Sequence, residues 1–248
     1  MQPSVQNQGD PSSYRNTART VGVIYLAGMV VGVGGNILLQ SILGAPDSLA
    51  SAAANSMLVA AGVMLWLLAV AGDAAHGILM FPILRRYSER IAFGYFGARM
   101  MDAVFVGVMA LLILFQLPLA REYLKAGVAD ASNLQSLSTV FMQAQLYAYH
   151  FGMITVGFAG LLLNHVFYRA RLLPRGLGVW GLIGYAVILC GSMLEVAGFD
   201  LMLIHTLPGG LWEIVVGLWL IAKGFSSSPV VSQRTSPSMV SVPSPATA

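Results

Sequence analysis

The chain has 248 residues, of which 57% are hydrophobic and only 9% are charged. A soluble globule carries about 25% charged residues and could not cover its surface with so few. This composition excludes an ordinary soluble enzyme, a disordered chain and a nucleic-acid-binding module, and it indicates a membrane protein.

Six apolar runs follow one another along the chain, and each is long enough to cross the hydrocarbon core of a bilayer as a helix. Helices are expected because strand edges would leave backbone groups unpaired in lipid. We predict an all-α, polytopic membrane helix bundle of about six transmembrane helices within residues 18–225. Residues 1–17 and 226–248 are predicted to be disordered, and 118–136 is predicted to form a small amphipathic segment. The expected spans are 20–43, 55–82, 91–117, 137–168, 177–197 and 205–223.

The basic residues predict how this bundle is oriented. Ten of the 13 Lys and Arg residues lie before the first span, in the turns after the second and fourth spans, or at and beyond the end of the sixth. The opposite side holds only Arg121 and Lys125, and Arg99 lies inside a span. Because basic loops stay on the cytoplasmic side, both termini are predicted to be cytoplasmic in a multi-pass protein of the inner cell membrane.

A set of motifs is spread over about residues 14–225. It includes Pro82–Ile83–Leu84–Arg85–Arg86, Gly94–Tyr95, Arg99, Leu173–Pro174–Arg175, Trp180–Gly181–Leu182–Ile183–Gly184, Glu213 and Lys223–Gly224–Phe225. Through them the chain is similar to the bacterial six-pass membrane proteins of domain-of-unknown-function family 4386. That family usually has Glu where Asp102 stands and Trp where Gly176 stands. The resemblance implies the fold and the membrane location, and it brings no activity.

Polar side chains inside the predicted spans are the candidates for a functional site. A charged residue at the centre of a bilayer costs about 2.5–3.5 kcal/mol, so these residues are expected to face the interior of the bundle. One arginine faces three acids, so an acid left over is expected to be neutral, to bind a cation or to pair with a protonated histidine. The candidate ion-pair or proton-binding layer is Asp73, His76, Arg99, Asp102, His150 and Glu213.

Several of these residues also have a purely structural interpretation. Arg99 with Asp102 or Glu213 could simply lock the third and sixth spans together. Glu195 and His205 lie near the outer boundary and are expected to be solvated. Other single features predict packing: Gly28 and Gly32 form a GxxxG pair typical of close helix contact, and the lone Cys190 is expected to be buried.

Three functions remain open. The first is a helix bundle that binds a lipid, an apolar or isoprenoid-like ligand, or a partner. The second is an enzyme acting on a lipid or isoprenoid by acid catalysis. The third is a small proton-coupled carrier, which would need a homodimer. The candidate catalytic residues are Asp102, Glu213 and His150, with Tyr147, Tyr149, Phe151 and Trp212 as expected pocket residues.

No metal-binding or nucleotide-binding motif is present, because HExxH, paired CxxC and phosphate-loop patterns are all missing from the sequence. We therefore expect no metal site and no cofactor. The expected partners are membrane lipids, with a homodimer left open and nucleic acid excluded.

Overall fold

The computed structural model describes residues 11–226, and these form helices without any strand. Six of the helical segments are long and apolar enough to cross a membrane. The prediction of an all-α, six-pass bundle is thereby confirmed. The elements are α1 Pro11–Leu43, α2 Ser48–Ala54, α3 Ser56–Arg85, α4 Glu89–Leu114, α5 Gln116–Tyr123, α6 Val128–Ala170, α7 Arg175–Val196, the 3₁₀ turn η1 Ile204–Thr206 and α8 Leu207–Ala222.

The helix boundaries differ from the expected ones mainly at two places. Helix α1 begins at Pro11, so residues 11–17, expected to be disordered, are helical. The segment 118–136 contains the end of α5 and the first turns of α6. Helix α6 has 43 residues and is about 64 Å long, twice the thickness of the hydrocarbon core. Residues 1–10 and 227–248 lie outside the described residues.

Local sequence explains where several helices begin and end. The Ser88 hydroxyl accepts a hydrogen bond from the backbone N–H of Ile91 (3.3 Å) and so caps α4 just after the arginine-rich turn. Asp47 caps the short helix α2 in the same way. Helix α6 ends at Ala170, and the next residue, Arg171, adopts a left-handed conformation (φ 52°) that lets the chain reverse into α7.

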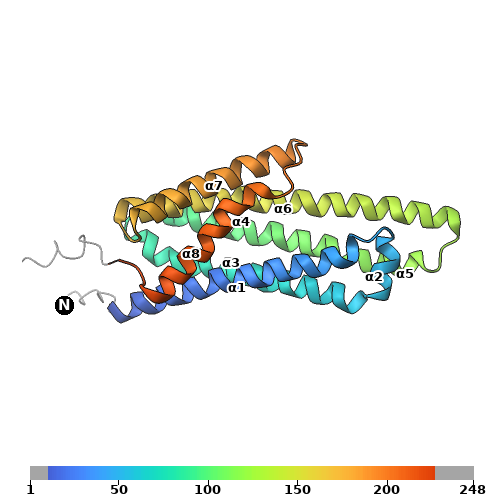
Figure 1. Cartoon of the computed structure of the whole chain (residues 1–248), viewed down its shortest axis with the longest axis horizontal. Coiled ribbons are helices and arrows are strands. Elements are labelled where there is room, and N and C mark those ends of the chain that lie inside the picture. Colours follow the sequence, from blue (N-terminus) through green and yellow to red (C-terminus); the bar gives the residue numbers. More distant parts are fainter. Residues whose placement is uncertain (1–10, 227–248) are drawn as a thin grey trace, which may run out of the picture.

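The six spanning helices form a closed ring. Each packs on the next along the chain, in the order α1, α3, α4, α6, α7, α8, and α8 packs back on α1. Figure 1 shows α1, α3, α4 and α6 running side by side, whereas α7 and α8 cover only the part of the molecule nearer the described chain ends. We call that end, which carries the turns around Arg85–Arg90 and Arg169–Arg175, the basic end, and the opposite end the distal end.

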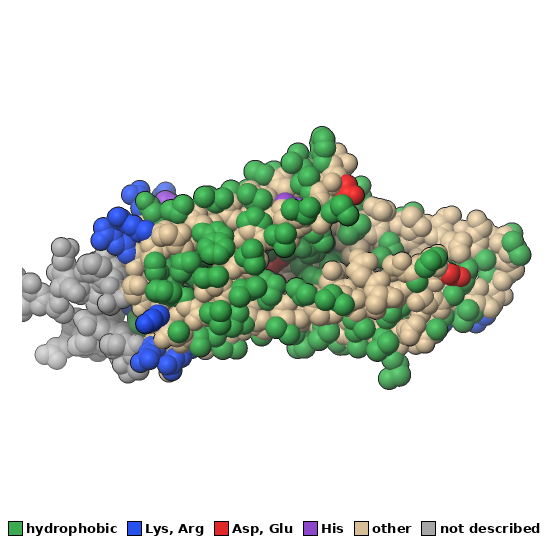
Figure 2. All heavy atoms as spheres, viewed as in Figure 1, with side chains coloured by type: hydrophobic (Ala, Val, Ile, Leu, Met, Phe, Trp, Pro, Cys, Tyr) green, Lys and Arg blue, Asp and Glu red, His purple; other side chains and the backbone are tan. Residues whose placement is uncertain are grey.

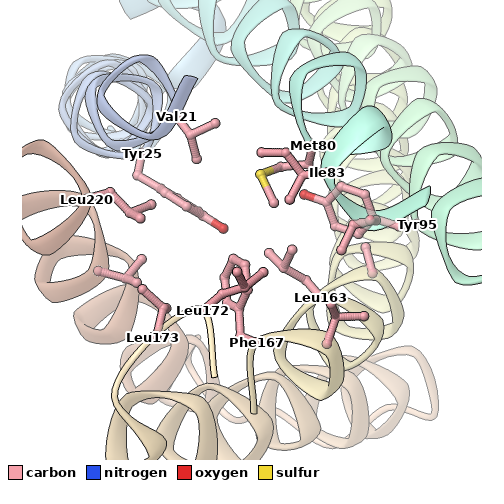
Figure 3. Packing of buried hydrophobic residues seen from close by; sticks show 14 of the residues in the cluster. Val21, Tyr25, Met80, Ile83, Tyr95, Leu163, Phe167, Leu172, Leu173 and Leu220 are labelled. Atoms are coloured by element: carbon pink, nitrogen blue, oxygen red, sulfur yellow. The ribbon is translucent and has the colours of Figure 1, made fainter. Parts of the chain in front are cut away.

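Apolar side chains fill the ring near the basic end. All six spanning helices contribute buried side chains to this cluster. Figure 3 shows them converging on the ring centre, among them Tyr25 from α1, Met80 from α3, Phe167 from α6 and Leu220 from α8. A second cluster packs α2 and α5 against the distal halves of α1, α3, α4 and α6. The middle of the bundle, between these two clusters, is where the polar residues lie.

Glycines bring α6 and α7 into close contact. A Cβ placed on Gly160 would lie 2.1 Å from the Tyr185 ring, and one placed on Gly181 would lie 2.0 Å from Asn164 Oδ1. Neither position has room for a methyl group unless the Tyr185 ring or the Asn164 side chain moves. Without a hydrophobic driving force between helices in lipid, such contact supplies much of the packing energy.

The variant Gly160→Ala should therefore lower the stability of the bundle by about 1–3 kcal/mol, because the added methyl overlaps the Tyr185 ring. Thermal unfolding in a neutral detergent measures this loss. The matched control is Gly107→Ala on α4, where the added Cβ meets no atom within 4 Å, and its stability should be unchanged or slightly higher. Equal stability of the two variants would contradict close α6–α7 packing.

Candidate functional site

A buried arginine lies between two acidic side chains in the middle of the bundle. Arg99, on α4, forms an ion pair with Asp73 on α3, and its Nη1 lies 3.5 Å from Oδ2 of Asp102. The Arg99 side chain is 10% exposed and that of Asp102 is fully buried, whereas that of Asp73 is 31% exposed. One guanidinium thus compensates two carboxyl groups, and Asp73 is the more accessible of them.

Glu213, on α8, does not join this ion pair. Its Oε1 accepts a hydrogen bond from the hydroxyl of Tyr185 at 2.7 Å. No Lys, Arg or His of the described residues lies within ion-pair distance of Glu213. The predicted lock between the third and sixth spans is therefore wrong for Glu213, because Arg99 has turned toward α3 instead. The carboxyl group of Glu213 has an aromatic hydroxyl as its partner and no counter-charge.

Aromatic side chains pack beneath these charges. The hydroxyl of Tyr95 is hydrogen-bonded to Nδ1 of His76, and His76 is 1% exposed. The ring of Tyr25 lies against that of His76 with centroids 4.5 Å apart, and Trp212 packs on Tyr25 at 5.9 Å. His76 therefore lies next to the central charges, and its hydrogen-bonding partner is the Tyr95 hydroxyl.

A cavity of about 460 Å³ opens beside this layer. Asp73, His76, Arg99 and Glu213 lie on its wall, which then continues toward the distal end between α1, α3, α4 and α6. Figure 2 shows the surface of the molecule hollowed near its middle. The apolar and amide side chains that line the rest of the cavity include Met29, Asn36, Leu39, Gln40, Trp66, Met109, Ile113, Met142, Gln145, Tyr149, Met153 and Leu211.

Two glycines of α1 border the cavity, and the prediction that they make a close helix contact is wrong. A Cβ placed on Gly28 would meet no atom within 4 Å, and one placed on Gly32 would only touch Trp66 at 4.0 Å. Helix α1 instead approaches α8 through Gly22, whose Cβ would lie 2.6 Å from the Gly217 carbonyl oxygen. The two helices diverge from that contact, which leaves Gly28 and Gly32 facing open space.

His150 lies in a separate polar cluster nearer the end of α7. Its Nε2 is 3.8 Å from Oε2 of Glu195, and Nδ1 of His205 is 4.0 Å from the other oxygen of the same carboxyl group. Ser192 Oγ is 3.2 Å from Nε2 of His205. The expectation that Glu195 and His205 are solvated is wrong, since their side chains are only 13% and 4% exposed. These contacts hold α7 and η1 against α6.

The structure therefore separates the three candidate catalytic residues. Glu213 lines the cavity, but Asp102 lies behind Arg99 and His150 is in the second cluster, and neither of these two lines the cavity.

The expected pocket aromatics divide in the same way. Tyr149 lines the cavity. Trp212 is buried but does not line the cavity, and Tyr147 and Phe151 are exposed on the lipid-facing side. Cys190, expected to be buried, is exposed.

Sequence reasoning overlooked the tyrosines that partner the polar layer. Tyr185 is hydrogen-bonded to Glu213, and Tyr95 is hydrogen-bonded to His76. A buried tyrosine needs a hydrogen-bonding partner. Tyr95 lies one turn from Arg99, and Tyr185 lies on a glycine-rich helix face. Both positions could therefore have been predicted to hydrogen-bond with the polar layer. Within the described residues, no group of three His, Cys, Asp or Glu side chains is arranged to hold a metal ion.

The geometry defines the class of the chain: it is a multi-pass helical membrane protein with a cavity that reaches a buried charge cluster. A family model, the domain of unknown function DUF4386, matches residues 20–224, and the chain belongs to this family. No curated protein and no solved structure matches the chain.

Replacing Arg99 with Met should destabilise the bundle by about 3–5 kcal/mol, because Asp73 and Asp102 would lose their counter-charge. Adding Asp73→Asn should recover part of this loss, since the two residues are direct partners. Unfolding in a neutral detergent gives both values. The control Arg90→Met, at the exposed basic end, should change stability by no more than about 0.5 kcal/mol. A double variant whose loss equals the sum of the single losses would contradict the pairing.

Proposed function

We propose that this protein binds an amphiphilic molecule in the cavity, with the polar end at Asp73 and Glu213 and the apolar part toward the distal end. The cavity itself carries the proposal, because its volume of about 460 Å³ is typical of small-molecule sites. Its wall combines a few convergent polar groups with a largely apolar remainder, as such sites usually do.

The shape of the bundle supports entry from the membrane. Several residues that border the cavity are themselves exposed on the side of the bundle, including Val33 on α1, Leu146 on α6, and Leu207 and Leu211 on α8. These side chains are apolar and would lie against lipid chains. An amphiphile dissolved in the bilayer could therefore reach the charged layer without passing through water.

Binding is a better-supported function than acid catalysis. Of the three residues considered for catalysis, only Glu213 lines the cavity. A carboxyl group that acts alone can hold a ligand, whereas a general acid also needs a reacting partner positioned against the substrate.

A cavity-filling variant tests this proposal. Gly28→Leu should lower the occupancy of co-purifying amphiphile at least about tenfold, because its side chain would extend into the cavity. Native mass spectrometry, with lipid extraction from the same preparation, measures occupancy. The matched control is Gly34→Leu on the same helix, which has equal room but does not line the cavity and should keep the occupancy of the unmodified chain. Equal occupancy in Gly28→Leu and Gly34→Leu would refute the proposed site.

We also propose that the protein resides in the inner cell membrane with its basic end in the cytoplasm. The basic side chains gather at that end, as Figure 2 shows, and basic loops remain cytoplasmic during insertion. A fluorescent protein fused to the C-terminus should therefore fold and fluoresce, and alkaline phosphatase fused there should stay inactive. The reverse pattern would place the basic end outside.

A further inference from the structure

We propose that the polar end of the bound amphiphile is a cation, namely the ammonium group of an alkyl amine, and that Glu213 is its counter-ion. This inference rests on the proposed binding function and specifies its ligand class. The apolar cavity accounts for the tail, and the polar wall selects the charge of the head.

The charges on the cavity wall favour a cation. Three acids lie in the central layer with one arginine, Arg99, and that arginine is already shared by Asp73 and Asp102. Glu213 lines the cavity, and none of the described basic residues lies within ion-pair distance of it. A carboxyl group in lipid surroundings is stabilised by a cation, and here the cavity is the side from which one can approach.

An anionic head group would meet the opposite situation. Arg99 is the single Lys or Arg side chain among the described residues that line the cavity, and binding an anion there would compete with Asp73 for the same guanidinium. The carboxyl groups of Asp73 and Glu213 would also repel the anion. An uncharged head group would gain hydrogen bonds only and would leave Glu213 without a counter-charge.

A buried histidine nitrogen beside the cavity also lacks a hydrogen-bonding partner within the described part of the chain. His76 is 1% exposed and lines the cavity, yet its Nε2 has no hydrogen-bonding partner among the described residues. Nε2 is a free acceptor in the tautomer in which Nδ1 donates to the Tyr95 hydroxyl, and it is a free donor in the tautomer in which the hydroxyl donates to Nδ1. An ammonium head group would donate to Nε2 in the first tautomer only, so the missing counter-charge at Glu213 carries the choice of a cation.

An aromatic ring beside the polar layer favours the same head group. Tyr25 lines the cavity next to His76, whereas Trp66 and Tyr149 pack with the distal cluster, where the apolar tail would lie. Cations are attracted to the faces of such rings, most strongly where water is excluded. The same rings would not attract a carboxylate or a phosphate.

Three probes with the same alkyl chain separate the alternatives: octylammonium, octanol and octanoate. Binding is measured by calorimetry on the full-length protein in neutral maltoside micelles near pH 7. Octylammonium is expected to bind at least about tenfold more tightly than octanol, and octanoate most weakly, because a hydrogen-bonded charge pair is worth at least that factor. Equal affinities, or tightest binding of octanoate, would overturn the inference without the use of any variant.

Variants at Glu213 test the counter-ion directly. Glu213→Gln should weaken octylammonium binding about tenfold or more and leave octanol binding unchanged, whereas Glu213→Asp should retain the preference for the cation. The control Glu122→Gln removes an exposed acid that does not line the cavity, and it should change neither affinity. A cation preference that survives Glu213→Gln would exclude Glu213 as the counter-ion.

The proposed function and this inference fail in different ways. If no probe binds, or if Gly28→Leu leaves the binding of all three unchanged, the cavity is not the ligand site. If octanol binds and Gly28→Leu abolishes that binding, but octylammonium shows no advantage, the cavity is the ligand site and only the charge assignment is wrong.

Discussion

The contact between Arg99 and its two carboxyl groups is the constraint on which the middle of this bundle depends. Unpaired charge is costly in lipid, so α3 and α4 must keep Asp73, Arg99 and Asp102 together and turned inward. That rotation places Tyr95 against His76 and brings His76 under Tyr25. The ion pair thus fixes which faces of α3 and α4 form the wall of the cavity. Glu213, on α8, also lines the cavity, but Arg99 does not compensate its charge.

The cavity exists because the six helices differ in length and angle. Glycines let α1 meet α8 closely at Gly22 and Gly217, and the two helices separate beyond that point. Helix α8 has only 16 residues and begins partway along the bundle, whereas α1, α3, α4 and α6 continue toward the distal end. The His150–Glu195–His205 contacts hold α7 and η1 in place beside α6. The apolar wall of the cavity and its charged inner part are the two features on which the proposed binding of an amphiphile rests.

Much of the polar layer was predictable, and its pairing was not. Asp73, His76, Arg99 and Glu213 could be identified because charged and imidazole side chains are costly in lipid and must therefore face the interior of the bundle. Their depth along each helix follows from the 1.5 Å rise per residue. The choice of Asp73 over Glu213 by Arg99 depends on how α3, α4 and α8 are rotated. His150 shows the same limit: its depth suited the central layer, but its helix face turns it toward Glu195.

The amino-acid sequence by itself determined the membrane location, the all-helical class and the number of spans, because hydropathy and helix length are properties of each segment alone. It also indicated that Asp73, His76, Arg99 and Glu213 face inward. Only the tertiary structure decided that Gly28 and Gly32 border a cavity instead of a helix contact, and that Glu213 has Tyr185 as its partner. Those outcomes depend on distances between helices, and such distances result from the packing of all six spans together.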